Sequence, residues 1–330
     1  MKIGNHNLNK KTLIIAEIGN NHEGSFLLAK KLIRLASDCG ADAVKFQTFS
    51  PNNYVSKEID PARFETLSRF YISYDKFKKL QIYANSLGLI FISTPFDIKS
   101  AKFLQNVVRV FKIASSDISF YPLIETICKT KKPLFLSTGI ADLSDLKKTI
   151  KFIKKFRSLD NVLLMHCVSN YPTKSSDVNL YNIFQLNKIV KYVGYSDHTI
   201  GIDAALCSVA MGAKVIEKHF TIDKNYSSFK DHKISANPDE FKNLVTKIRL
   251  FEKLKGISKF KFPKINNKNL LRRSISINCN KKSGTVIKKS EITWVRPGLG
   301  VSPGNESKFI GKKVKNDLKQ GTLLKLKDVI

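Results

Sequence analysis

Eight short runs of apolar and β-branched residues alternate with helical segments along the first three quarters of the chain. The runs have the length and composition of buried strands: Leu13–Ile18, Ala43–Thr48, Leu89–Pro95, Val108–Ser115, Pro133–Gly139, Val162–Val168, Tyr192–Ser196 and Lys214–Phe220. Eight units of strand and helix over about 250 residues match the size and rhythm of an α/β fold, the (β/α)₈ or TIM barrel.

The segments between these runs carry apolar residues at helical spacing. In the first, Leu28, Leu32 and Leu35 mark one face and Gly40 supplies a C-terminal stop. The later helical patterns cover Tyr74–Leu87, Ile98–Gln105, Leu123–Lys129, Leu143–Arg157, Leu180–Val190, Ile202–Met211 and residues 238–255. An open, doubly wound sheet produces the same alternation, but no GxGxxG opens the first unit. We therefore predict a barrel domain over residues 1–256.

The composition and the secondary-structure pattern of the sequence change after residue 256. Residues 257–273 form a basic connector with few apolar residues, which we interpret as a linker. Residues 274–330 show short strands separated by Gly and Pro turns, as in "EITWVRPGLGVSPG", and predict a small β-rich domain. A module of this size has little core of its own, so we expect it to lean on the barrel or on a second copy of it.

The net charge and the cysteine content bear on the partners and the cellular compartment of the protein. There are 57 Lys and Arg against 27 Asp and Glu, a formal charge of +30, but the lysines are spread along every segment as singles and pairs. Nucleic-acid binders concentrate charge on one face, so we expect no specific nucleic-acid partner. Five widely spaced cysteines without a CxxC pair are typical of a reducing compartment. With no signal h-region and no apolar run of bilayer length, we expect a cytoplasmic protein without a membrane partner.

Nearly every predicted strand stops on polar or ionisable groups. Barrel enzymes place their sites at the C-terminal ends of the strands, so these groups predict an active site there. The candidates in chain order are Glu17, Lys45, Gln47, Lys112, Ser115, Ser116, Asp117, Ser137, Thr138, Ser196, Asp197, His198, Glu217, Lys218 and His219.

Two of these groups are lysines within apolar strands. Lys45 and Gln47 share one face of their strand by the two-residue period. A buried lysine is costly unless an anion meets it, and Lys112 repeats the feature on another strand. Together they predict a pocket for a small acid carrying two or three negative charges. Ser115 has the opposite parity to Lys112 and must act from the loop beyond the strand.

Two neighbouring strands each end on a histidine. His198 and His219 lie close enough in a barrel to share one divalent ion, with further coordination positions left for water or substrate. Asp197 and Glu217 are alternatives, either as ligands or as partners that fix the imidazole tautomers.

At these residues a resemblance to a known family emerges. The motifs "IIAEIGNNHEGS", "ADAVKFQTF", "KIASSDISFYPLIE", "LSTG", "HCVSNYPT", "GYSDHTIG", "EKHFTID" and "WVRPGLG" follow in this order, and nearly the whole chain resembles the sialic acid synthase family. That resemblance implies a TIM barrel followed by a small antifreeze-like (SAF) domain, in a domain-swapped homodimer in which each small domain covers the partner's barrel mouth. It also implies condensation of phosphoenolpyruvate with an open-chain N-acylated amino sugar, using a divalent metal such as Mn²⁺, with Mg²⁺ or Co²⁺ as alternatives.

The resemblance assigns roles to individual residues of this chain. His198 and His219 would bind the metal, and Arg296 of the partner's small domain would grip the N-acyl group of the sugar. Phosphoenolpyruvate would be held by Lys45, Lys112, Ser115, Ser137 and Ser196, and the sugar would face Glu17, Gln47, Tyr171 and Asp231. Two departures weaken the transfer: Asp117 stands where some members have Glu, and Ser169 where some have Asn.

The implied chemistry agrees with the residues. A metal makes the sugar aldehyde electrophilic while lysines neutralise phosphoenolpyruvate, whose C3 attacks; water adds at C2 and phosphate leaves. Asp117 or Glu17 would move protons, and the sequence does not rank them. Arg296 suits planar recognition of a carbonyl or a carboxylate.

Other functions stay open at this stage. N-acetylmannosamine, its 6-phosphate, and the 2,4-diacetamido-trideoxy sugars of legionaminate and pseudaminate synthesis are all candidate acceptors. A Schiff-base pyruvate aldolase using Lys45 or Lys112 is the nearest different mechanism. A basic sugar-binding protein on a decayed barrel is the non-enzyme alternative.

Overall fold

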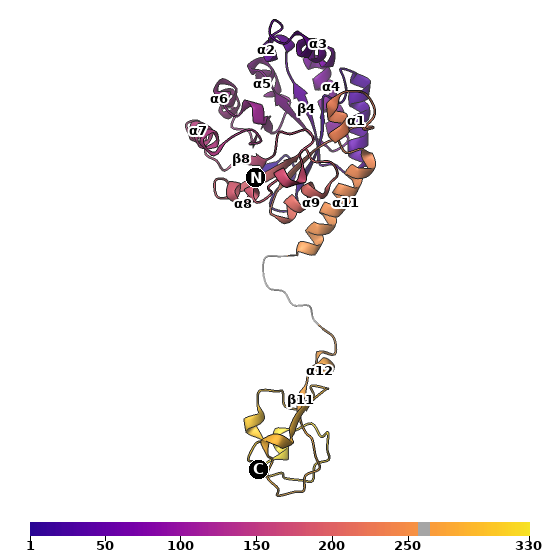
Figure 1. Cartoon of the computed structure of the whole chain (residues 1–330), viewed down its shortest axis with the longest axis vertical. Coiled ribbons are helices and arrows are strands. Elements are labelled where there is room, and N and C mark those ends of the chain that lie inside the picture. The colour runs from indigo at the N-terminus through magenta and orange to yellow at the C-terminus, as the bar shows by residue number, and fades with distance from the viewer. Residues whose placement is uncertain (257–264) are drawn as a thin grey trace. The chain divides into compact units, whose positions relative to one another are not determined.

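The computed structural model describes residues 1–256 and 265–330, which belong to two compact units divided after Gly256. The first unit is a closed barrel of eight parallel strands in the order β10-β3-β4-β5-β6-β7-β8-β9, surrounded by helices (Figure 1). The bounds of these strands are β3 Leu13–Gly19, β4 Ala43–Thr48, β5 Ile90–Pro95, β6 Phe111–Ile113, β7 Leu134–Ser137, β8 Val162–His166, β9 Tyr192–Asp197 and β10 Val215–His219. Pairing of β10 with β3 closes the sheet and excludes the open alternative.

The helices follow the strands in the expected alternation. Their bounds are α1 Phe26–Asp38, α2 Pro51–Tyr54, α3 Pro61–Phe70, α4 Tyr74–Ser86, α5 Ile98–Leu104, α6 Tyr121–Lys129, α7 Leu143–Lys154, α8 Asn182–Asn187, α9 Asp203–Ala210, α10 Lys230–Ile234 and α11 Pro238–Lys255. Side-chain oxygens cap several of them: Ser25 accepts from the Leu28 amide at the start of α1, and Asn237 and Glu240 form a reciprocal capping box on α11.

The strands divide their side chains between two layers by the two-residue period. Outward-facing residues such as Ile14, Val44 and Ile216 join the large core between sheet and helices. Inward-facing residues near the N-terminal ends, including Leu13 and Val215, form a separate apolar cluster inside the barrel. A hairpin of β1 (Lys2–Ile3) and β2 (His6–Asn7) adds Ile3 to this cluster. Side chains therefore fill the barrel interior near the N-terminal ends of the strands, and space for ligands is left at their C-terminal ends.

The second unit is small and β-rich. Helix α12 (Lys268–Leu271) precedes an antiparallel pair of β11 (Ser274–Ile277) and β12 (Ile292–Val295). Its core is a cluster of eight buried side chains: Ile275, Ile277, Ile287, Ile292, Phe309, Val314, Leu318 and Leu324.

The predicted fold class is confirmed, with differences in detail. The strand expected over Val108–Ser115 is only Phe111–Ile113, so Ser115 does lie beyond it, in a 3₁₀ turn. Helices α2, α3 and α10 and the first hairpin were not predicted. Of the predicted linker 257–273, residues 257–264 lie outside the described part, and the rest contains α12. Among the described helices, none has the length and apolar character needed to span a bilayer.

Candidate active site

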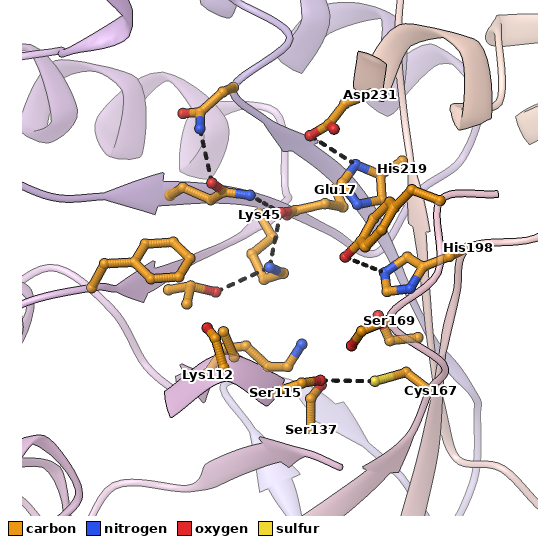
Figure 2. A pocket seen from close by; sticks show the side chains of 18 of the residues that line it. Glu17, Lys45, Lys112, Ser115, Ser137, Cys167, Ser169, His198, His219 and Asp231 are labelled. Atoms are coloured by element: carbon orange, nitrogen blue, oxygen red, sulfur yellow. Dashed lines mark hydrogen bonds and ion pairs between the residues drawn. The ribbon is translucent and has the colours of Figure 1, made fainter. Parts of the chain in front are cut away.

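A cavity of about 590 Å³ opens at the C-terminal ends of the barrel strands. Fourteen of the residues predicted from the sequence line it together: Glu17, Lys45, Gln47, Lys112, Ser115, Ser116, Ser137, Ser169, Tyr171, Ser196, His198, Glu217, His219 and Asp231. Figure 2 shows the two lysines on one side, the hydroxyl groups below, and the two histidines opposite. Those that belong to strands occupy the alternate positions that face the barrel interior, near the C-terminal ends of the strands, so their side chains meet in one cavity.

Two lysines and two glutamates alternate across the floor of the cavity. The Lys45 ammonium lies 3.0 Å from Glu17 Oε1 and 3.7 Å from Glu217 Oε1. The Lys112 ammonium lies 2.9 Å from the same Glu217 oxygen. Ser196 Oγ also donates to that oxygen, at 2.9 Å. The lysines are therefore partnered by carboxylates at the site where an acidic substrate is expected.

The pKa values of these groups diverge. Burial raises the pKa of Glu17 to about 7 against the attraction of Lys45. Burial acts in the same direction on Glu217, but the charges of Lys112 and Lys45 outweigh it and lower its pKa to about 2. For Lys112, burial outweighs the attraction of Glu217 and lowers the pKa. Paired groups with pKa values pushed apart are a signature of acid and base roles, and Glu17 is the member that titrates near neutral pH.

Hydroxyl groups form the second part of the cavity. The Gly139 amide donates to Ser115 Oγ at 3.0 Å, and Ser115 Oγ lies 3.0 Å from the thiol sulfur of Cys167. Ser137 Oγ is buried and has no hydrogen-bond partner. A Cβ on Gly139 would lie 2.5 Å from Cys167 Sγ and from Ser169 Oγ, so any larger residue would displace these side chains. The unmet hydroxyl and the nearby lysines suit phosphate or carboxylate oxygens.

The two histidines present neutral imidazoles. Burial lowers the pKa of His198 and, more strongly, that of His219. His198 Nδ1 donates to the Val168 carbonyl at 2.7 Å, which leaves Nε2 as an acceptor facing the cavity, 3.2 Å from the Tyr171 hydroxyl. The ring centroids of His198 and His219 are 5.6 Å apart. His219 Nδ1 is buried without a hydrogen-bond partner, 4.0 Å from Asp231 Oδ2.

These features fit a divalent metal. Neutral imidazole is the form that binds metals, and a backbone carbonyl fixes the tautomer of His198 as expected for a ligand. Among the described residues, no group of three or more His, Cys, Asp and Glu side chains converges to hold an ion. The protein would thus supply the two imidazoles, and water or substrate would complete the coordination.

Asp197 does not serve the histidines, contrary to one alternative considered from the sequence. Its carboxylate points to the outer face of β9, where it pairs with Lys218 at 2.8 Å. The Thr199 amide and hydroxyl donate to its other oxygen. The second alternative, Glu217, is engaged by the two lysines and not by an imidazole.

Comparison with known proteins adds the decisive observation. Residues 32–259 match the NeuB family and residues 282–330 match the SAF domain. An uncharacterized protein of Methanocaldococcus jannaschii is 41% identical, covering 100% of this chain and 98% of that protein. The N,N'-diacetyllegionaminic acid synthase of Legionella pneumophila is 40% identical over 94% of this chain and 92% of its own. The chain belongs to the NeuB family.

A similar solved structure agrees with this membership. The N-acetylneuraminic acid synthetase of Leptospira borgpetersenii superposes with a TM-score of 0.73 at 33% identity, covering 80% of this chain and 92% of that one. Enzymes of the NeuB family are phosphoenolpyruvate-dependent nonulosonic acid synthases, and they generally use a divalent metal. This chain is therefore such an enzyme, with phosphoenolpyruvate and an amino sugar as the substrates that its family implies.

Helix α10 carries Asp231 of this NeuB protein to the edge of the cavity. The next residue, His232, is fully buried: its Nε2 donates to Glu23 Oε1 at 3.1 Å, and its Nδ1 lies 2.6 Å from Thr221 Oγ1. Asn21 Nδ2 donates to the Phe220 carbonyl and to Ser235 Oγ, at 2.9 Å each. These contacts fasten α10 to the loops after β3 and β10, and so hold Asp231 beside His219.

Five of the predicted residues do not line the cavity: Thr138, Asp197 and Lys218 among the strand-end candidates, and Asp117 and Arg296. Asp117 lies beside it, with Oδ2 buried and unpartnered, and burial raises the pKa of its carboxyl to about 6. Arg296 lies in the second unit, exposed, and precedes a cis peptide bond to Pro297.

Some cavity residues were missed from the sequence. Thr94 accepts from the Lys45 ammonium at 3.0 Å, and its parity with Ile90 and Ile92 was a usable signal. Asn20 Nδ2 donates to Gln47 Oε1 at 2.8 Å, which leaves its buried Oδ1 unpartnered. The face of α3 that lines the mouth had no signal, because α3 itself was not predicted.

Proposed function

We propose that this enzyme condenses phosphoenolpyruvate with an open-chain N-acylated amino sugar to give a nine-carbon 2-keto acid and phosphate. The observation that carries the proposal is the juxtaposition, in one cavity, of two buried ammonium groups, an unpartnered hydroxyl at Ser137 and two neutral imidazoles. The first two features suit an enol phosphate, and the third suits a carbonyl substrate held beside a metal.

The lysines and serines take the phosphoenolpyruvate end. When phosphoenolpyruvate binds, Lys45 and Lys112 exchange some of their hydrogen bonds to Glu17 and Glu217 for hydrogen bonds to its phosphate and carboxylate oxygens. The hydroxyl groups of four serines donate to the same oxygens: Ser115, Ser137, Ser169 and Ser196. The added negative charge favours protonation of Glu17, whose pKa is already about 7. Substrate binding thereby loads a proton onto a group that lines the cavity.

His198 and His219 would hold the divalent metal, which when bound polarises the sugar aldehyde. Mn²⁺ is the first choice, with Mg²⁺ and Co²⁺ as alternatives. The Val168 carbonyl fixes the orientation of the His198 ring through Nδ1 at 2.7 Å, and the Tyr171 hydroxyl, 3.2 Å from Nε2, would give up this contact when the metal binds there. Gln47 and Asp231 face the acceptor chain and orient its hydroxyl groups.

The reaction forms one carbon–carbon bond and one carbon–oxygen bond, to water, and breaks the carbon–oxygen bond to phosphate. C3 of phosphoenolpyruvate attacks the aldehyde carbon, and the aldehyde oxygen takes a proton. Water adds at C2 and loses its proton, and the tetrahedral intermediate collapses to the 2-keto acid with departure of phosphate. Glu17 is the better candidate for these proton transfers because it lines the cavity, whereas Asp117, whose Oδ2 is also unpartnered, does not.

We propose further that the SAF unit completes the site in a domain-swapped homodimer, with Arg296 of one chain reaching the N-acyl group bound in the other. Deletion of Ser274–Ile330 should abolish turnover and leave a folded barrel, as judged by circular dichroism and thermal melting. Full activity of the truncated protein would contradict this role.

Phosphate release tests the function directly. The enzyme with Mn²⁺ should release phosphate only when phosphoenolpyruvate and an N-acylated amino sugar are both present. A Schiff-base aldolase would instead use pyruvate and be trapped by borohydride on Lys45 or Lys112. Tight sugar binding without turnover would favour the sugar-binding alternative.

A further inference from the structure

One wall of the cavity has no role in the chemistry assigned so far. It is built mainly by α3, which with α2 is inserted between β4 and α4. Arg63, Thr66, Leu67 and Phe70 follow one another at helical spacing and all line the cavity, so α3 turns a single face toward it.

The inner half of this wall is apolar. Leu67 and Phe70 belong to a buried cluster with Phe96, against which Tyr54 and Phe229 pack. The Tyr54 and Phe96 rings stack with centroids 4.6 Å apart, and Phe70 meets Phe229 edge to face at 4.9 Å. All five also line the cavity. Phosphoenolpyruvate and the hydroxyl-bearing carbons of a sugar are too polar to pack favourably on such a surface, which favours methyl and methylene groups.

The outer half of the wall carries one cation. The Arg63 guanidinium lies 5.5 Å from the centre of the Tyr54 ring and donates to its hydroxyl at 3.4 Å. Among the described residues, no carboxylate lies within 4.0 Å of it. A guanidinium on an aromatic ring with unused donors is suited to a planar carbonyl.

The wall is continuous with the acceptor side of the cavity. Phe229, which meets Phe70 of α3 edge to face, lies two residues before Asp231, and all three residues line the same cavity. A sugar chain whose aldehyde lies at the histidines and whose middle passes Asp231 would extend its far end toward α3.

We propose that the face Arg63–Thr66–Leu67–Phe70 is a binding subsite for the far end of the acceptor, and that it selects a sugar with a second N-acyl group and a deoxygenated terminal carbon. The acyl and terminal methyl groups pack on Leu67 and Phe70, and the acyl carbonyl accepts from Arg63. The inner half of this face, where Leu67 and Phe70 lie, offers no partner to a 6-phosphate, and only Arg63 and Lys230 at the exposed mouth could attract one. The acceptor class is thus a 2,4-diacylamino-2,4,6-trideoxyhexose, an inference that rests on the proposed function.

The test compares kcat/KM for three acceptors: N-acetylmannosamine, its 6-phosphate and 2,4-diacetamido-2,4,6-trideoxymannose. We expect the last to be preferred by roughly 100-fold, the size of discrimination that one apolar group with a matched polar contact supplies. Arg63→Gln, at an exposed position that does not threaten folding, should reduce this preference about tenfold, and Phe70→Ala should reduce it further. The KM for phosphoenolpyruvate should not change. Arg69→Gln, on the same helix but outside the cavity lining, is the matched control.

The outcomes separate the two proposals. If phosphate is released fastest with the 6-phosphate or with N-acetylmannosamine, or if Arg63→Gln lowers kcat/KM equally for all three sugars, the subsite is wrong and the proposed function stands. If none of the sugars supports phosphate release, the proposed function fails, and the subsite with it. Phe70→Ala is interpreted only if its melting temperature shows a folded protein, while Arg63→Gln carries the test in any case.

Discussion

The two faces of β9 and β10 each bury an ion-pair cluster, and the clusters differ in how fully they are satisfied. On the outer face, Asp197 accepts from Lys218, Thr199 and the Tyr195 hydroxyl, so both carboxylate oxygens are engaged. On the inner face, Glu217 and Ser196 are the sequence neighbours of that pair, and they join Glu17 and the two lysines.

Several polar atoms at the inner cluster have no hydrogen-bond partner. Glu17 Oε2, Ser137 Oγ and Asn20 Oδ1 are buried around the cavity without partners. The pKa of Glu17 is raised to about 7 and that of Glu217 is lowered to about 2. A buried ion pair by itself is weak evidence of function, since structural pairs are common. Unmet polar atoms aimed into a cavity are what distinguish the inner face.

The largest expected effect follows from removing the metal. Chelation, or the change His219→Ala, should lower phosphate release by at least about 10⁴-fold, because the aldehyde loses its electrophilic partner. Isothermal titration with Mn²⁺ should show binding to the wild type and none to His219→Ala. His166→Asn is a control, because His166 is a buried histidine bonded to the Val178 carbonyl and does not line this cavity. Metal-independent turnover would contradict the assignment.

Next in size is the inner ion pair. Lys112→Met should reduce turnover roughly 10³-fold through loss of charge stabilisation for the phosphate. Because the change leaves Glu217 without one of its cations, Lys112→Met/Glu217→Gln should recover melting temperature without recovering activity. Recovery of activity in the double variant would show that the pair is structural, as on the outer face.

The outer ion pair should respond in the opposite way. Lys218→Met leaves Asp197 buried and short of a cation, at a cost of about 3–5 kcal/mol in the free energy of unfolding. Denaturant titration measures this loss, and kcat of the folded enzyme should stay within about fivefold of wild type, below the loss of a transition-state contact. If Lys218→Met lowered kcat as much as Lys112→Met does, the outer pair could not be purely structural, and the proposed difference between the two faces would be wrong.

Asp117 offers a smaller effect with a defined pH dependence. Its pKa is raised from 3.8 to about 6, so the folded state holds a proton that the unfolded state releases between these values. The resulting penalty is absent below pH 3.8 and complete above pH 6, where it reaches roughly 2–3 kcal/mol. Asp117→Asn should therefore melt several degrees higher than wild type at pH 8 and equally at pH 4. A pH-independent difference in scanning calorimetry would contradict this origin.

The smallest effect is expected at His232, which holds α10. His232→Leu should raise the KM for the acceptor about tenfold, since Asp231 loses its fixed position, and leave the KM for phosphoenolpyruvate unchanged. Lys233→Ala, at the next and exposed position, should change neither. Equal increases in both KM values would indicate general loosening of the barrel instead of a local effect on Asp231.

Several features of the site follow from short-range patterns in the sequence. The two-residue period put Lys45 and Gln47 on one face, and the opposite parity of Ser115 correctly predicted a position beyond the strand. The eight apolar runs and their polar ends predicted both the barrel and the side of it that holds the cavity. Such patterns are local, and backbone geometry alone converts them into a facing direction.

The partners of those residues were decided by the tertiary structure. Parity cannot tell that Glu217 bridges Lys45 and Lys112 or that Asp197 turns away toward Lys218, because the strand register and the closure of β10 on β3 fix these distances. The α3 wall was likewise invisible, since a short helix with a mixed face has a weak periodic signal. The sequence by itself determined which strands carry chemistry and which way their side chains face. Only barrel closure, which brings residues some 200 positions apart into contact, decided which charges meet and which polar atoms stay free for a substrate.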